Sequence, residues 1–93
     1  MVNETDPKVL LMRARVKAAE MRIRASHQDQ NAAAHKRQAA KPIYDGQSEI
    51  CMGKAAIIED LAAKTRAEAD LIEAEADAAY AAHEAAGPVP GAG

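Results

Sequence analysis

Apolar and polar residues follow a helical period over two long stretches of this chain. Across residues 7–40, apolar side chains recur every three or four positions, and no Gly or further Pro follows Pro7. Thr5 or Asp6 can cap a helix start there, and Pro7 suits the first helical position. Residues 49–86 show the same period. The pattern therefore predicts two long helices of nearly equal length.

Residues 41–48 interrupt the helical pattern. Pro42 pushes Lys41 out of the α region, and Asp45-Gly46 is a turn signal. Ser48 is placed to cap the second helix. Because a short link between helices of similar length favours an antiparallel arrangement, the predicted fold is all-α, a long two-helix hairpin in a single domain.

The ends of the chain and one internal segment add detail to this prediction. Gly87-Pro88 is a strong helix stop, so the second helix should end near residue 86 and residues 87–93 should form a flexible tail. Residues 1–6 are expected to lead into the first helix. Ser26–Asn31 has poor or middling helix propensity, so the first helix either runs unbroken or breaks there to give three helices.

Each predicted helix has two apolar stripes when its residues are placed 100° apart. The predicted inner packing face contains Val9, Met12, Val16, Ile23, Ile57, Ile58, Leu61 and Ile72. The predicted outer association face contains Leu10, Ala14, Met21, Ala25, Ala56, Ala63, Ala67, Ala74 and Ala78. A solitary hairpin needs one apolar face per helix, so the outer face predicts a homo-oligomer, such as a four-helix bundle, or a helical protein partner. Helix propensity alone is the alternative explanation for the outer alanines of residues 49–86.

Composition indicates a thin core that other helices complete. Alanine accounts for 24 of the 93 residues, Leu, Ile and Val together for 14, and Phe and Trp are absent. Alanine is the best helix former, but so few large side chains leave little to bury. A lone two-helix unit of this kind would be marginally stable, and a deep ligand pocket or an enzyme core is disfavoured.

Charge is divided unevenly between the halves of the chain. Residues 1–41 contain nine Lys or Arg and four Asp or Glu, whereas residues 42–93 contain three and ten. Antiparallel pairing would set a basic helix beside an acidic one, and such patterns select partner and orientation. The cations are also candidate phosphate contacts, so an accessory protein that binds nucleic acid is an alternative function. These candidates are Arg13, Arg15, Lys17, Arg22 and Arg24.

No arrangement of reactive side chains indicates catalysis. His27 and His35 are eight residues apart, too far to chelate as an i,i+4 pair, and His83 suits a helix C-terminus. Cys51 is alone and is expected to be a small buried hydrophobe. The many carboxylates form a solvated helical face without the apolar surroundings that acid–base catalysis needs. We therefore expect no enzyme activity, cofactor, metal or small-molecule substrate.

The expected function is that of a non-enzymatic structural or interaction protein. An adaptor, an assembly subunit or a virion-type component would suit such a hairpin. No stretch is apolar enough to span a membrane, and the N-terminus lacks the features of a signal peptide. With a single cysteine there is no intrachain disulfide, so the expected location is the cytoplasm or a macromolecular assembly.

Two tyrosines provide a further alternative. Tyr44-Asp45-Gly46 lies in the predicted turn, and Tyr80 is followed four residues later by Glu84. In these positions the chain resembles the small helical-hairpin substrates of type VII secretion, which have Trp-x-Gly in the turn and Tyr-x-x-x-Asp/Glu near the C-terminus. The Trp is missing here. The resemblance implies an exported hairpin, whereas packing at the open end of the hairpin is the other explanation of Tyr80.

Overall fold

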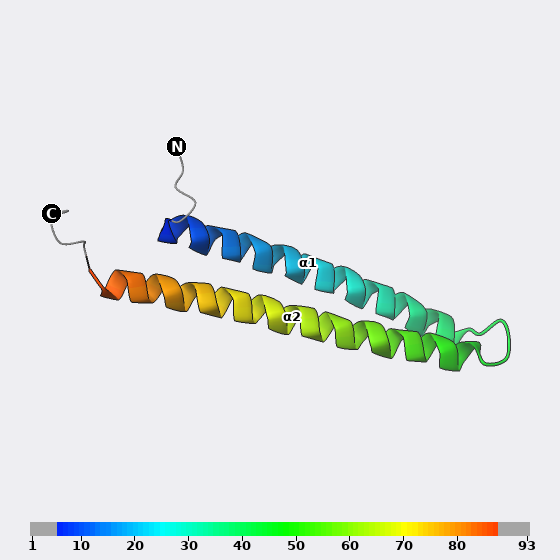
Figure 1. Ribbon diagram of the computed structural model, residues 1–93. Helices are drawn as coiled ribbons and strands as arrows, with labels where there is room; N and C mark the ends of the chain where they lie inside the picture. The colour runs from blue at the N-terminus through cyan, green and yellow to red at the C-terminus, as the bar shows by residue number, and fades with distance from the viewer. Residues whose placement is uncertain (1–5, 88–93) are drawn as a thin grey trace.

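The computed structural model describes residues 6–87 of the chain. Within that range the chain forms two helices, α1 (Pro7–Ala40) and α2 (Gln47–Ala85), and no strand. The helices lie side by side and antiparallel (Figure 1). The turn lies at one end of the rod, and the start of α1 and the end of α2 lie at the other. The predicted all-α antiparallel hairpin is thereby confirmed.

The start of α1 follows from two adjacent residues. The Asp6 carboxylate accepts a hydrogen bond from the backbone N–H of Lys8 at 2.8 Å, and Pro7 occupies the first turn. The helix then continues through residues 26–31 without interruption, so the three-helix alternative is wrong. The propensity deficit of each residue in that segment is only a few tenths of a kcal/mol, roughly, and Ala25 and Ala32, buried on either side, offset it by packing.

The start of α2 differs from the expectation. The N-cap is Gly46, which adopts φ +82°, a left-handed conformation that glycine reaches without steric strain. Ser48 lies inside the helix, and its hydroxyl donates to the Ala39 carbonyl oxygen at 2.7 Å. Predicting Ser48 as a cap for α2 was therefore wrong. Its side chain instead satisfies a carbonyl group in the last turn of α1, which has no partner within that helix.

The end of α2 lies next to the predicted glycine stop. The helix ends at Ala85, and Gly87 has φ +74° with its N–H donating to the Glu84 carbonyl oxygen at 3.0 Å. The remainder of the predicted tail, residues 88–93, and most of the predicted cap segment, residues 1–5, lie outside the described residues.

Small side chains recurring every seven residues line the interface between the two helices. Those buried there are Ala18, Ala25, Ala32 and Ala39 of α1 and Ala55, Ala62 and Ala69 of α2. We call these seven residues the alanine seam. Because alanine has only a methyl group, the seam favours an interaxial distance near 8 Å, the short end of the range for packed helices.

Larger and more polar residues fill the positions between the seam alanines. Met21 packs with Ala18 and Ala69 in the main apolar cluster, and Ile72 lies against it. Nearer the turn, Thr65 is buried and its hydroxyl donates to the Leu61 carbonyl oxygen at 2.9 Å. The core is thus apolar toward the open end of the hairpin and mixed toward the turn.

The residues assigned to the inner packing face of α1 do not lie between the helices. Met12, Val16 and Ile23 are 52%, 54% and 57% exposed. Met21 and Ala25, which the sequence assigned to the outer face, are buried in the interface instead. The inner assignments of Met12, Val16 and Ile23 were therefore wrong, and so were the outer assignments of Met21 and Ala25. Leu10, also assigned to the outer face, is 50% exposed.

The assignment on α2 was wrong in part. Ile72 packs on the core and Ile58 is half-buried, but Ile57 is 71% exposed and Leu61 is 49% exposed. Two physical reasons explain the errors. Large side chains usually lie inside, which favoured the wrong stripe. Placement at 100° per residue also blurs a seven-residue repeat, by about 20° in each heptad.

Candidate interaction surfaces

A line of apolar side chains follows the face of α1 that points away from α2. It consists of Val9, Met12, Val16, Ala19 and Ile23, and we call it the outer stripe. Each member lies two residues before a position that faces α2, such as Ala18 after Val16 or Ala25 after Ile23. Two residues correspond to about 200° of helical rotation, so the outer stripe lies opposite the alanine seam.

The outer stripe is open to solvent and is edged by charge. Met12, Val16 and Ile23 are exposed, and Val9 is half-buried. A shallow groove follows the first part of the stripe. It is lined by Asp6, Lys8, Val9, Met12, Arg13, Val16, Lys17 and Glu20. The surface therefore combines an apolar floor with a rim in which cations outnumber anions.

The two helices have opposite net charge over their described lengths. α1 contains eight Lys or Arg and two Asp or Glu, whereas α2 contains three and nine. Four α1 residues spaced seven apart, Arg15, Arg22, Asp29 and Lys36, form ion pairs with α2. They lie along one edge of the interface, so a single row of contacts sets the register of the hairpin.

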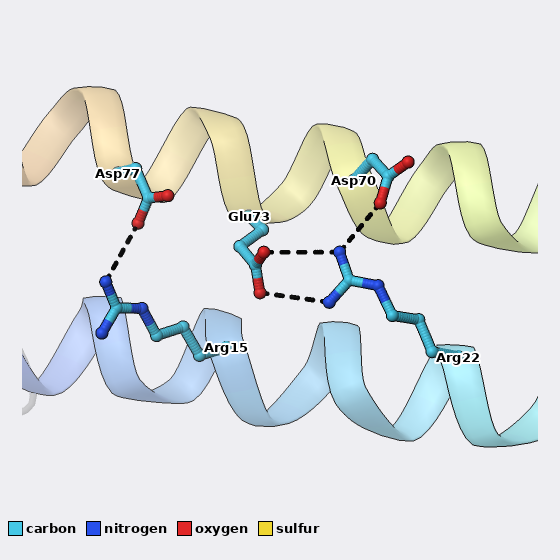
Figure 2. A network of polar contacts seen from close by, with 5 residues as sticks. All are labelled: Arg15, Arg22, Asp70, Glu73 and Asp77. Atoms are coloured by element: carbon cyan, nitrogen blue, oxygen red, sulfur yellow. Dashed lines mark hydrogen bonds and ion pairs between the residues drawn. The ribbon is translucent and has the colours of Figure 1, made fainter.

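Arg22 is the centre of this row (Figure 2). Its Nη2 lies 2.8 Å from Asp70 Oδ1, and its Nη1 lies 3.2 Å from Glu73 Oε2. Hydrogen bonds to Asp70 and Glu73 raise the pKa of the Arg22 guanidinium above its ordinary value, and the bond to Asp70 is the larger cause. Seven residues earlier in α1, about two helical turns away, Arg15 reaches Asp77 at 3.4 Å (Figure 2). These pairs are largely exposed, so they contribute orientation more than stability.

The candidate phosphate contacts are not gathered into one basic patch. Arg15 and Arg22 are held by carboxylates of α2. Lys17 and Arg24 lie along the opposite edge of the interface, where they make no ion pair with the described residues. A nucleic acid would have to compete with α2 for two of the five candidates, which disfavours this alternative.

The alanines assigned to the outer face of α2 are exposed, but they do not form a continuous apolar surface. Ala56, Ala63, Ala67, Ala74 and Ala78 all face solvent. Asp60, Asp70 and Asp77 lie among them at helical spacing. Four of the five exposed large apolar residues of α2 form a separate and interrupted row, which leaves out Met52. They are Ile50, Ile57, Leu61 and Leu71, with Lys54, Lys64 and Glu68 between them.

The open end of the hairpin holds the second tyrosine. Tyr80 is half-buried, and its ring centroid lies 6.5 Å from that of His83. A hydrogen bond with Glu84 raises the pKa of the Tyr80 hydroxyl above 10.0. Tyr80 also lines a small hollow between the helix ends that Leu10 and Leu11 help to form. Packing and hydrogen bonding within the hairpin thus account for Tyr80 and Glu84.

Over residues 6–87, no group of three or more His, Cys, Asp or Glu is placed to hold a metal ion. Cys51 is buried, with its Sγ 3.9 Å from Gln38 Oε1. In the same part of the chain, no helix is long and apolar enough to cross a membrane.

Sequence reasoning identified the residues of the outer stripe but gave them the wrong place, and it missed the role of Ala18. The available signal was the recurrence of alanine every seven residues, at 18, 25, 32 and 39 and again at 55, 62, 69 and 76. The two series of four lie at or beside the interface, whereas the exposed Ala67, Ala74 and Ala81 form a shorter series of the same spacing. Size and hydrophobicity instead favoured the residues of the outer stripe.

No protein family, curated protein or solved structure matches this chain. Its function is therefore inferred from its own surfaces.

Proposed function

We propose that this protein is a non-enzymatic structural or interaction protein, a helical hairpin that packs against partner helices in a larger assembly. The observation that supports it is the outer stripe. Met12, Val16 and Ile23 expose more than half of their surface although smaller alanines fill the interior. Burying the exposed half of each of these side chains against a partner would contribute roughly 1 kcal/mol to the free energy of binding. A partner would supply the second neighbour that α1 lacks.

The spacing of the outer stripe suits a helix as that partner. Its members are separated by three and four residues alternately, which is the spacing of the a and d positions of a coiled coil. α2 already holds the opposite face of α1, so the stripe is presented on a supported helix. This pre-organisation lowers the entropy lost on docking.

Self-association through the outer stripe is less favourable than binding a different chain. Two copies of α1 placed side by side would bring two cationic rims together, and like charges across such a seam are destabilising. Sedimentation at micromolar concentration addresses this directly. A monomer would agree with a separate partner, and a dimer abolished by Val16→Glu would indicate self-association.

Site-specific photo-crosslinking in the cells that make the protein tests the proposed function. A photoreactive phenylalanine analogue would replace Val16 in one variant and Ala67, on the exposed back of α2, in the other. We expect a discrete adduct from position 16 that maps to a helical segment, is absent from position 67 and disappears with Ile23→Glu. Equal adducts from both positions, or adducts insensitive to Ile23→Glu, would contradict the proposal.

A further inference from the structure

We infer that the occupant of the outer stripe is an acidic amphipathic helix of another protein. This inference rests on the proposed function and adds to it the chemistry and the source of the partner. It follows from the width of the stripe, from the charge at its edges and from the two faces that a second copy could offer.

The width of the outer stripe fits one helix. From Val9 to Ile23 it extends over roughly four helical turns and contains two positions per heptad. Charged residues border it on both sides, with Lys8 on one edge and Arg13 and Glu20 on the other. A helix that lies on a membrane presents a much wider apolar face, and Glu20 would oppose an anionic bilayer. The narrow stripe therefore favours a partner helix over a lipid surface.

The charge at the edges of the outer stripe favours a partner with carboxylates beside its apolar positions. Arg15 and Arg22 already form ion pairs with α2. Lys8, Lys17 and Arg24 make no ion pair with the residues that the structure describes. Charges that flank a helical seam set partner choice and orientation, so acidic residues on the partner would be preferred here. The acidic residues of α2 already pair in this way with Arg15 and Arg22, on the side of α1 that faces α2.

A second copy of this chain offers no suitable face. Antiparallel pairing of two α1 helices with Arg15 at the midpoint would place Arg15 beside its equivalent and Lys8 beside Arg22. On the back of α2, Asp60, Asp70 and Asp77 interrupt the alanines, so this face offers the stripe no continuous apolar surface. The row of Ile50, Ile57, Leu61 and Leu71 on α2 is broken by three charged residues. The observations therefore favour a different protein.

The test uses the full chain and two synthetic helical peptides, each roughly three heptads long. Both peptides have Ile and Leu at the a and d positions, and the flanking positions are Glu in one and Lys in the other. Binding is followed by fluorescence anisotropy at low and high salt. The stripe variant is Val16→Ser with Ile23→Ser. The matched control is Ile57→Ser, an exposed isoleucine on α2.

We expect the Glu peptide to bind at least tenfold more tightly than the Lys peptide, with this preference falling as salt rises. The stripe variant should lose at least tenfold in affinity for the Glu peptide, and the Ile57→Ser control should keep it. Equal, stripe-dependent binding of both peptides would refute the acidic partner and leave the proposed function standing. No stripe-dependent binding of either peptide would refute both.

Two further measurements distinguish the proposed partner helix from the other possible occupants of the stripe, a second copy of the chain and a membrane. Stripe-dependent dimerisation of the chain in sedimentation would assign the surface to a second copy. Stripe-dependent binding to vesicles of phosphatidylcholine and phosphatidylserine, without binding of the Glu peptide, would assign it to a membrane. Either result overturns the inference, and a monomer that leaves such vesicles unbound supports it.

Discussion

The two faces of α1 reverse the usual relation between size and burial. Toward α2, the alanine seam places methyl groups in the interior, and Ala18 and Ala25 are fully buried. On the opposite face, the outer stripe leaves Val16 and Ile23 in solvent. Ordinary domains bury their large aliphatic residues first. The contrast shows that the seam allows close approach of the two helices, and the exposed stripe is the observation on which the proposed partner helix rests.

The same contrast explains how so thin a core can hold a hairpin. Alanine loses no side-chain rotamer freedom on burial, and close helices gain backbone and methyl contacts along their whole length. Met21 and Ile72 add the larger apolar contacts near the open end. The seam is therefore sensitive to added volume, whereas the stripe should be indifferent to it in the isolated protein.

Adding volume to the seam should have the largest effect. Ala62→Leu places a large side chain where Ala62 is fully buried, so the helices must separate or the side chain must strain. Overpacking of this kind costs about 1–3 kcal/mol, and a core made of few layers should lie at the upper end. Urea unfolding followed by far-UV circular dichroism measures the loss.

Ala63→Leu is the matched control for that substitution. Ala63 is the next residue along α2 and is exposed, so its replacement should change the free energy of unfolding by less than about 0.5 kcal/mol. Similar losses for the two variants would contradict the close approach of the helices at the seam.

The next largest effect should come from removing volume, and it should differ between the two faces of α1. Met21 is buried, so Met21→Ala should cost about 2 kcal/mol, the lower end for core truncations because alanine also improves helix propensity. Ile23 is exposed two residues later, so Ile23→Ala should change the free energy of unfolding by less than about 0.5 kcal/mol. Chemical denaturation of both variants decides this. A greater loss for Ile23→Ala than for Met21→Ala would mean that Ile23 lies in the interface, as the sequence first predicted.

The hairpin was predictable from the sequence because its signals are local. Asp6-Pro7, Asp45-Gly46 and Gly87 each act through the backbone of the residues next to them. The choice of inner face was not local. Val16 and Ala18 compete for the same interface, and hydrophobicity favours Val16 although close packing requires Ala18. That choice depends on the interhelical distance, which is a property of both helices together.

Breaking the ion-pair row should have a smaller effect than either change in the core. Arg22→Gln removes the contacts with Asp70 and Glu73, and the loss should diminish in about 1 M NaCl because salt screens exposed charges. Lys17→Gln is the control, since Lys17 forms no ion pair with the described residues. Thermal unfolding at low and high salt compares the variants. An Arg22→Gln loss that persists in high salt would mean that Arg22 supports packing instead of register.

The smallest expected effect lies at the open end of the hairpin, beyond the seam. The hydrogen bond from Tyr80 to Glu84 raises the pKa of the Tyr80 hydroxyl above 10.0. Because the folded value exceeds the unfolded one, this contact stabilises the hairpin fully below about pH 10, and the contribution disappears as pH rises through the folded pKa. Phenolate absorbance in a Tyr44→Phe background, where Tyr80 alone titrates, should show Glu84→Gln shifting the Tyr80 pKa back toward 10.0. If both forms titrate at the same pH, Tyr80 and Glu84 do not form this contact in solution, and they would be available to an outside partner as the outer stripe is.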